Sequence, residues 1–202
     1  MKLNNQKLEE LFQHLESLHH IPSADIPNID LYMDQVTTLM EKHLGNSRRY
    51  PEDKILTKTM INNYAKNNLL PPPNKKRYTK EHILLLVFIY YFKNLVSIGD
   101  IEEILRPISE HYFAAPDSPI SLEDIYNQVF SLAPEQTERM KQELFTQFES
   151  AQSLFPDLAE EDQDTLRLFA FICELSHDVY MKKMLIEKLV DEMKAETPAK
   201  KK

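Results

Sequence analysis

Apolar residues recur every three or four positions along most of this chain, which is the spacing of amphipathic helices. The pattern predicts helices over residues 4–19, 29–44, 57–68, 80–94 and 97–105, further helices opened by Ser121 and by Pro134, and a long one over 160–194. Gly45, Asn68 and Pro107 are expected to end the second, third and fifth of these helices. Residues 21–28 contain two prolines and are interpreted as a linker.

The most apolar segment runs without interruption from Ile83 to Phe92. A helix that is apolar on all sides is buried on several sides, so we expect this one at the centre of a domain. Its ten residues are too few for a bilayer, which needs about 20. No apolar signal segment follows the N-terminus. These features predict a cytoplasmic protein without a membrane span.

The C-terminal half carries an aromatic stripe at helical spacing, which favours core packing over a ligand pocket. Its residues are Phe145, Phe148, Phe169, Phe171 and Tyr180. Cys173 lies among them and is interpreted as a buried structural thiol. As the single cysteine it forms no internal disulfide, which favours a reducing compartment.

Charge is distributed unevenly along the chain. The formal net charge is −8, yet residues 45–93 hold ten Lys and Arg against three Asp and Glu. A basic middle between acidic flanks is typical of a polyanion-binding module. The alternative is an ordinary solvated surface. With only two glycines, the chain lacks both the turns of a large β fold and a glycine-rich phosphate loop.

Metal and catalytic chemistry find little support in the sequence. His14, His19 and His20 have no carboxylate or thiol at ligand spacing, so they are interpreted as surface residues. Cys173 and His177 share a helix face but supply only half of a zinc site, which a second protomer would have to complete. Paired carboxylates such as Glu102 and Glu103 lie in helix N-terminal turns. The chain is therefore not expected to be an enzyme or to need a cofactor.

The informative stretch is residues 56–105, where order and residue type resemble the DNA-binding domain of MerR-type regulators. The matching residues are Thr57, Ile61, Tyr64, Leu69-Leu70-Pro71, Lys76, Tyr78-Thr79, Ile83, Val96-Ser97-Ile98, Ile101, Ile104 and Leu105. The whole chain also resembles an uncharacterised bacterial family, domain of unknown function 1836. The MerR resemblance implies an all-α fold with a small β-wing, a winged helix-turn-helix followed by a C-terminal helical segment.

The resemblance implies that the helix after Thr57 enters the major groove while the basic turn before Tyr78 contacts the backbone. The expected DNA-binding residues are Arg48, Arg49, Lys58, Thr59, Asn62, Asn63, Lys66, Lys75, Lys76, Arg77 and Tyr78. Tyr78 is expected to offer its hydroxyl to a phosphate. The family carries arginines where this chain has Thr59 and Asn62, and the candidates to compensate are Arg48, Arg49 and Lys54 on the preceding loop.

Four segments follow from this interpretation: an N-terminal helix and linker (1–28), the winged helix-turn-helix domain (29–112), a C-terminal helical region (113–195) and a disordered tail (196–202). We expect a transcriptional regulator that binds double-stranded DNA as a homodimer through its C-terminal helices. The sequence identifies no small-molecule effector. The alternatives are a protein-interaction module on the same scaffold and an excision-type or architectural factor that bends DNA.

Overall fold

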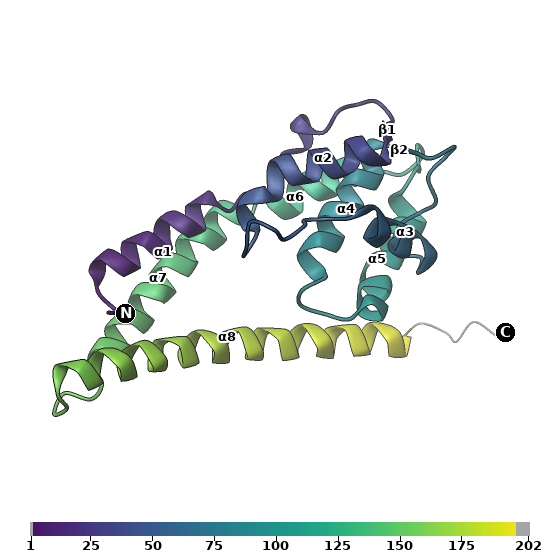
Figure 1. Cartoon of the computed structure of the whole chain (residues 1–202). Helices are drawn as coiled ribbons and strands as arrows, with labels where there is room; N and C mark the ends of the chain where they lie inside the picture. The colour runs from purple at the N-terminus through teal and green to yellow at the C-terminus, as the bar shows by residue number, and fades with distance from the viewer. Residues whose placement is uncertain (1, 197–202) are drawn as a thin grey trace. The chain divides into compact units, whose positions relative to one another are not determined.

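The computed structural model describes residues 2–196, and over that range the chain is mostly helical with one small two-stranded sheet (Figure 1). Its helices are α1 (Asn5–Ser17), α2 (Met33–Leu44), α3 (Lys58–Lys66), α4 (Lys80–Phe92), α5 (Ile98–Tyr112), α6 (Leu122–Phe130), α7 (Ala133–Gln152) and α8 (Glu160–Glu196). Short 3₁₀ turns occupy Ser23–Asp25 and Gly45–Ser47. None of the described helices is long and apolar enough to cross a membrane. The predicted tail lies, from residue 197 on, outside the described residues.

The chain forms two compact units. The first contains the residues up to Leu18 together with Leu132–Leu185, and the second contains His19–Ser131 together with the chain from Ile186 onward. This division differs from the segments expected from the sequence. The 21–28 segment and α6 belong to the same unit as α2 to α5, since Ile21, Ile26, Leu122 and Tyr126 are buried in its core.

The core of the second unit is built around α4. Every residue from His82 to Ile89 is buried, as the uninterrupted apolar run predicted. A helix with no polar face must be covered on all sides, and α5, α6 and β2 (Arg77–Tyr78) contact it. Ile61 and Tyr64 of α3 belong to the same cluster. The position of α3 is therefore fixed by apolar packing beneath it.

Two short strands connect the beginning of the second unit to its basic segment. Strand β1 (Leu31–Tyr32) pairs with β2 in antiparallel register, with Leu31 opposite Tyr78 and Tyr32 opposite Arg77. The sequence had placed residues 29–32 in a helix. Two residues are too few to show the alternation of a strand, so this element was missed.

The 21–28 segment is held in place by a buried hydrogen bond. The Tyr126 hydroxyl of α6 donates to the carbonyl oxygen of Ile21 at 2.5 Å, and both residues are fully buried. Burial raises the pKa of Tyr126, because the charged form would lose its hydration. The segment expected to be a linker thus packs into the core.

In the first unit, α1 lies beside α7 (Figure 1). Their apolar faces share a small core with the first half of α8, built from Leu3, Leu8, Leu144, Phe148, Ala151 and Phe171. Asn4 caps α1 by accepting a hydrogen bond from the Lys7 N–H at 2.9 Å. The core position expected for Phe148 and Phe171 is confirmed.

Other residues of the predicted C-terminal stripe do not lie in a core. Phe145, Phe169 and Tyr180 are 47%, 64% and 57% exposed, and Cys173 is also exposed. The prediction of a buried thiol and of a fully covered stripe was therefore wrong. Helical spacing indicates which residues share a face, but it does not indicate whether the same chain covers that face.

Several other helix ends agree with the sequence signals, and two do not. Ser97 with Asp100 and Ser121 with Asp124 form capping boxes, and Asn68 adopts a φ of 57° after α3. By contrast, α5 passes through Pro107 and ends at Tyr112, not at Leu105. Gly45 follows α2 but keeps a right-handed φ of −57° and enters a 3₁₀ turn.

Candidate nucleic-acid interface

Helix α3 separates its apolar and polar residues sharply. The Thr57 side chain accepts a hydrogen bond from the Met60 N–H at 3.1 Å, which fixes where the helix begins. Ile61 and Tyr64 are buried, and burial raises the pKa of the Tyr64 hydroxyl. The exposed side chains are those expected from the sequence: Lys58, Thr59, Asn62, Asn63 and Lys66. They offer amides and ammonium groups suited to base edges and phosphates.

The basic turn before β2 has an unusual backbone. Lys75 and Lys76 have φ values of 49° and 65°, and the Arg77 N–H closes the turn on the carbonyl of Asn74 at 2.9 Å. Positive φ at both central residues is the requirement of a type I′ hairpin turn, in which glycine and asparagine are preferred. Each lysine held in this left-handed conformation destabilises the folded state by about 1–2 kcal/mol. Both lysines are exposed.

Tyr78 does not lie on this surface. It is only 3% exposed, and burial raises the pKa of its hydroxyl. The prediction that Tyr78 offers its hydroxyl to a phosphate was therefore wrong. Its ring instead packs against Leu31 across the strand pair and against the edge of the His82 ring, at a centroid distance of 5.5 Å. Tyr78 anchors the basic turn to the core.

His82 holds the start of α4 beneath this turn. The Thr79 N–H donates to Nδ1 at 3.0 Å, so the ring proton of the neutral imidazole lies on Nε2. Nε2 is buried without a regular hydrogen bond and faces the carbonyl groups of Pro72 and Pro71. Burial lowers the pKa of His82, an effect partly opposed by these carbonyls and by the charge of Asp30. The imidazole is thus suited to remain neutral.

Helix α2 contacts both α3 and β2 and so links the two exposed basic elements. Lys58 of α3 forms an ion pair with Asp34 in the first turn of α2. The Arg77 guanidinium lies over the Tyr32 ring, 5.9 Å from its centroid. These contacts bring both the start of α3 and the base of the turn close to the start of α2.

Part of the basic charge counted in the sequence is neutralised or buried. Arg48 pairs with Glu41 at 2.6 Å, and Lys80 pairs with Glu123 at 2.8 Å. Lys93 is half-buried and donates to the carbonyl of Ile55 at 2.7 Å, and burial lowers its pKa. Arg49 lies over the Tyr50 ring on the exposed loop. The count of Lys and Arg over residues 45–93 therefore overestimates the positive charge available on the surface.

A groove of about 590 Å³ lies between α2, the loop after it and the first turn of α3. Its lining includes four cationic side chains, Lys42, Arg48, Lys54 and Lys58, against one acidic residue, Glu41. Lys42 and Lys54 are exposed and have no ion-pair partner among residues 2–196. A groove of this charge beside a helix N-terminus is suited to a phosphate group.

The sequence missed Lys42 as a site residue and underrated Lys54. Lys42 lies on α2, outside the stretch that resembled the DNA-binding domain, so no motif marked it. A helical-spacing argument could have found Lys42, because it lies one turn after Thr38 on the same face of α2, and both residues line the groove. Within the described residues, no group of three or more His, Cys, Asp and Glu could hold a metal ion.

Comparison with known proteins gives one result. A family model described as Domain of unknown function (DUF1836) matches residues 21–129, just over half of the chain. No curated protein matches the sequence, and no solved structure matches the fold. The matched range covers α2 to α6 and includes every candidate interface residue.

The position of His82 generates a pH prediction. Its pKa is lowered in the folded state, so below its ordinary value of 6.5 the unfolded chain binds the proton more readily. The stability that neutral His82 contributes is full above that pH and is lost as the pH falls below it. Chemical denaturation between pH 7.5 and 5 should therefore show a decreasing free energy of unfolding.

His82→Gln should reduce this pH dependence. Gln35 at the equivalent position of α2 accepts from the Tyr32 N–H at 2.8 Å, so glutamine can replace the Nδ1 acceptor without titrating. A residual slope should remain from His20, whose pKa burial and the neighbouring His19 also lower. The prediction is contradicted if the free energy of unfolding depends on pH as steeply in His82→Gln, and in the His20→Gln/His82→Gln double variant, as in the wild type.

Proposed function

The chain belongs to the DUF1836 family, and from this premise we propose that it is a transcriptional regulator that binds double-stranded DNA through a MerR-like winged helix-turn-helix. In this proposal α2 and α3 form the helix-turn-helix, and α3 enters the major groove. The Asn74–Arg77 turn acts as the wing and contacts the phosphate backbone. The groove lined by Lys42 and Lys54 receives a further phosphate.

The observation that carries the proposal is the conformation of the wing tip. Asn-Gly would form the same turn with less strain, because glycine has no Cβ to clash at positive φ. Lys75 and Lys76 stand there instead, exposed and without an ion-pair partner among the described residues. Backbone strain of this kind is found mainly at positions where the side chain has a function. Two ammonium groups at a hairpin tip are suited to adjacent phosphates.

The polar face of α3 supports the same role. Asn62 and Asn63 can each pair with the exposed edge of adenine in the major groove, and Lys66 can reach a phosphate. Their backbone is held by Ile61 and Tyr64 beneath, so the outward side chains sit on a rigid support. Rigid placement of this kind is needed for base readout.

We further propose that the regulator is a homodimer formed through its C-terminal helices. In the first unit, α8 exposes seven large apolar residues by 46–64%: Phe169, Ile172, Val179, Tyr180, Met181, Met184 and Leu185. Burying an aliphatic or aromatic side chain of this size stabilises an interface by about 1.5–3 kcal/mol. A twofold dimer would present two α3 helices to a palindromic site.

A protein-interaction module on the same scaffold is the second candidate. It is favoured by the ion pairs of Arg48 and Lys58, which weaken the field available to a polyanion. The two functions differ in their dependence on the wing charges. A protein partner that binds equally well after charge reversal of Lys75 and Lys76 would favour this candidate.

DNA binding should depend strongly on salt. Fluorescence anisotropy with labelled genomic fragments at 50–200 mM salt should give a log–log slope of about −0.9 for each neutralised phosphate. Lys42→Ala/Lys54→Ala should make the slope shallower by about 0.9, because the phosphate contact in the groove is lost. Lys7→Ala/Lys188→Ala removes the same charge elsewhere and should leave the slope unchanged. A flat salt dependence of the wild type would exclude DNA as the partner.

Replacing the wing tip should separate stability from binding. Lys75→Asn/Lys76→Gly relieves the strained turn and should stabilise the fold by about 1 kcal/mol while weakening DNA binding severalfold. Lys75→Ala/Lys76→Ala keeps a Cβ at both positions, so it should weaken binding equally without stabilising the fold. Thermal denaturation and anisotropy titration measure the two effects. DNA affinity unaffected by either variant would argue against a wing.

The dimer prediction concerns the exposed face of α8. Light scattering of the wild type at tens of micromolar should give twice the chain mass of 23.8 kDa. Phe169→Ser/Tyr180→Ser should shift the mass toward the monomer, because the proposed contact loses two aromatic side chains. Ile29→Ser, at a residue that is 67% exposed in the other unit, should remain dimeric. A monomeric wild type would contradict this part of the proposal.

A further inference from the structure

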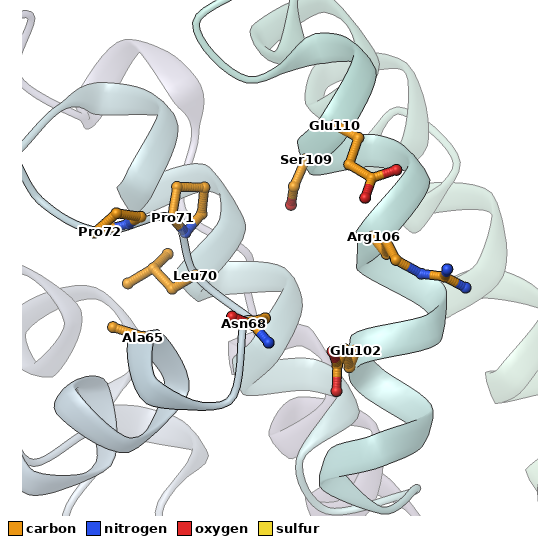
Figure 2. A pocket seen from close by; sticks show the side chains of 9 residues that line it. All are labelled: Ala65, Asn68, Leu70, Pro71, Pro72, Glu102, Arg106, Ser109 and Glu110. Carbon is orange, nitrogen blue, oxygen red and sulfur yellow. The ribbon is translucent and has the colours of Figure 1, made fainter. Parts of the chain in front are cut away.

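A second concave site lies in the second unit, away from the exposed face of α3. It is a pocket of about 370 Å³ between the end of α3, the Leu70–Pro72 segment and α5 (Figure 2). This volume is within the range of small-molecule sites, which is about 300–1,000 Å³. None of its lining residues belongs to the proposed DNA surface.

One wall of the pocket is apolar and fixed. Leu70 is 1% exposed, and Pro71 and Pro72 follow it in a backbone that proline keeps rigid. Figure 2 shows Ala65 at the end of α3 on the same side as these residues. This wall can accept the hydrocarbon part of a ligand without rearranging.

The opposite wall, from α5, carries polar groups with unused hydrogen-bonding capacity. The Ser109 hydroxyl oxygen is buried and has no hydrogen-bond partner, and Figure 2 shows it directed toward the proline wall. A buried hydroxyl without a partner destabilises the protein unless something else satisfies it. Glu102 is half-buried, and it forms no ion pair or hydrogen bond with the described residues.

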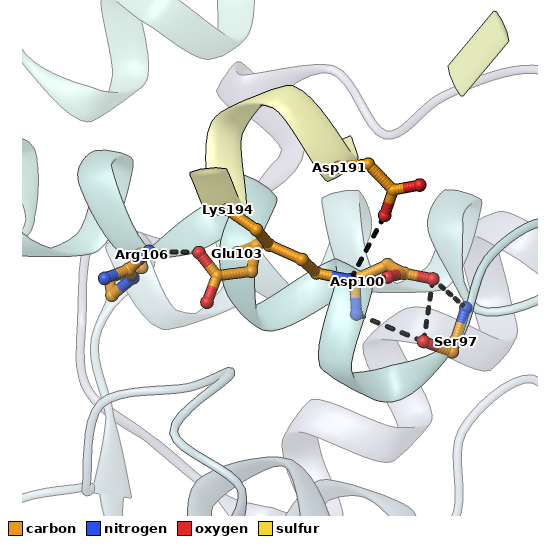
Figure 3. Close-up of polar contacts among 6 residues, drawn as sticks. All are labelled: Ser97, Asp100, Glu103, Arg106, Asp191 and Lys194. Atoms are coloured by element: carbon orange, nitrogen blue, oxygen red, sulfur yellow. Dashed lines mark hydrogen bonds and ion pairs between the residues drawn. The ribbon is translucent and has the colours of Figure 1, made fainter. Parts of the chain in front are cut away.

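The one cationic residue of the pocket is directed elsewhere. Figure 2 shows the Arg106 guanidinium turned away from the proline wall, and Figure 3 shows it paired with Glu103, outside the pocket. The polar wall therefore combines a carboxylate that has no cation with a hydroxyl that has no partner. Both groups can accept a hydrogen bond, and one carries a negative charge.

We propose that this pocket binds a small organic ammonium ion. Glu102 holds the charge, the ammonium N–H groups donate to the carboxylate and to Ser109 Oγ, and the hydrocarbon part lies against Pro71 and Pro72. A neutral alcohol would lack the charge that Glu102 requires, and a carboxylate would be repelled by it. The proposal does not depend on DNA binding, because all the groups belong to the free protein.

The test uses the full chain and three probes of similar size: benzylamine, benzyl alcohol and benzoate. Isothermal titration and methyl-resolved NMR of the Ala65 resonance should show saturable binding of benzylamine only. Glu102→Gln should reduce its affinity at least tenfold. Glu52→Gln, an exposed carboxylate outside the pocket, removes the same charge and should leave the affinity unchanged.

Ser109→Ala provides a second test, because its expected result differs from that of replacing a serine with a purely structural role. Removing the partnerless hydroxyl should raise the melting temperature of the free protein by about 2–4 °C. The same variant should bind benzylamine severalfold more weakly. The proposal is overturned if benzylamine binds no better than benzyl alcohol, or if Glu102→Gln and Glu52→Gln change the affinity equally, since attraction to the net negative chain would then account for binding.

Discussion

The burial of α4 is the constraint on which the second unit depends. Eight successive residues of this helix are removed from water, so neighbouring elements must cover it on every side. Tyr78, Ile61 and Tyr126 reach its cluster from the strand pair, α3 and α6 respectively. Each buried aliphatic side chain contributes about 1.5–3 kcal/mol. The basic turn and the polar face of α3 are therefore fixed by the apolar groups directly beneath them.

The sequence predicted this core because its signal was strong and local. Ile83 to Phe92 is uninterrupted, and Thr57, Ser97 and Ser121 are caps whose chemistry acts within three residues. The end of α5 was misplaced because proline was weighed as a stop signal. The apolar spacing of Ile101, Leu105, Ile108 and Tyr112 continues across Pro107, and their packing outweighs the one lost backbone hydrogen bond.

The electrostatic surface was harder to predict because it depends on pairs distant in the sequence. Lys58 meets Asp34 and Lys80 meets Glu123 only after folding. Counting charges along residues 45–93 could not reveal these pairs or the burial of Lys93. The same limit applies to Lys42, which joins Lys54 through the approach of α2 to the loop. The exposed face of α3 was predictable, since Ile61 and Tyr64 orient it.

At two places in the second unit the residues present destabilise the fold, and a simple substitution would remove that cost. The Asn74–Arg77 turn holds lysines at positive φ, and α5 holds a buried hydroxyl without a partner. Natural sequences keep such local conflicts where function requires them, and the two differ in kind. The first concentrates charge on an exposed turn, whereas the second leaves acceptors inside a pocket.

Helix α5 connects the pocket to the end of the chain. On one side it lines the pocket beside Leu70–Pro72, and near its start Asp100 pairs with Lys194 of α8 at 2.6 Å (Figure 3). The hydrogen bonds from Lys194 and Ser97 hold the pKa of Asp100 below its ordinary value, so this ion pair persists at neutral pH. Val190 is buried, and Ile186 is partly buried against the core of the second unit, so the last turns of α8 and helix α5 belong to the same packed unit.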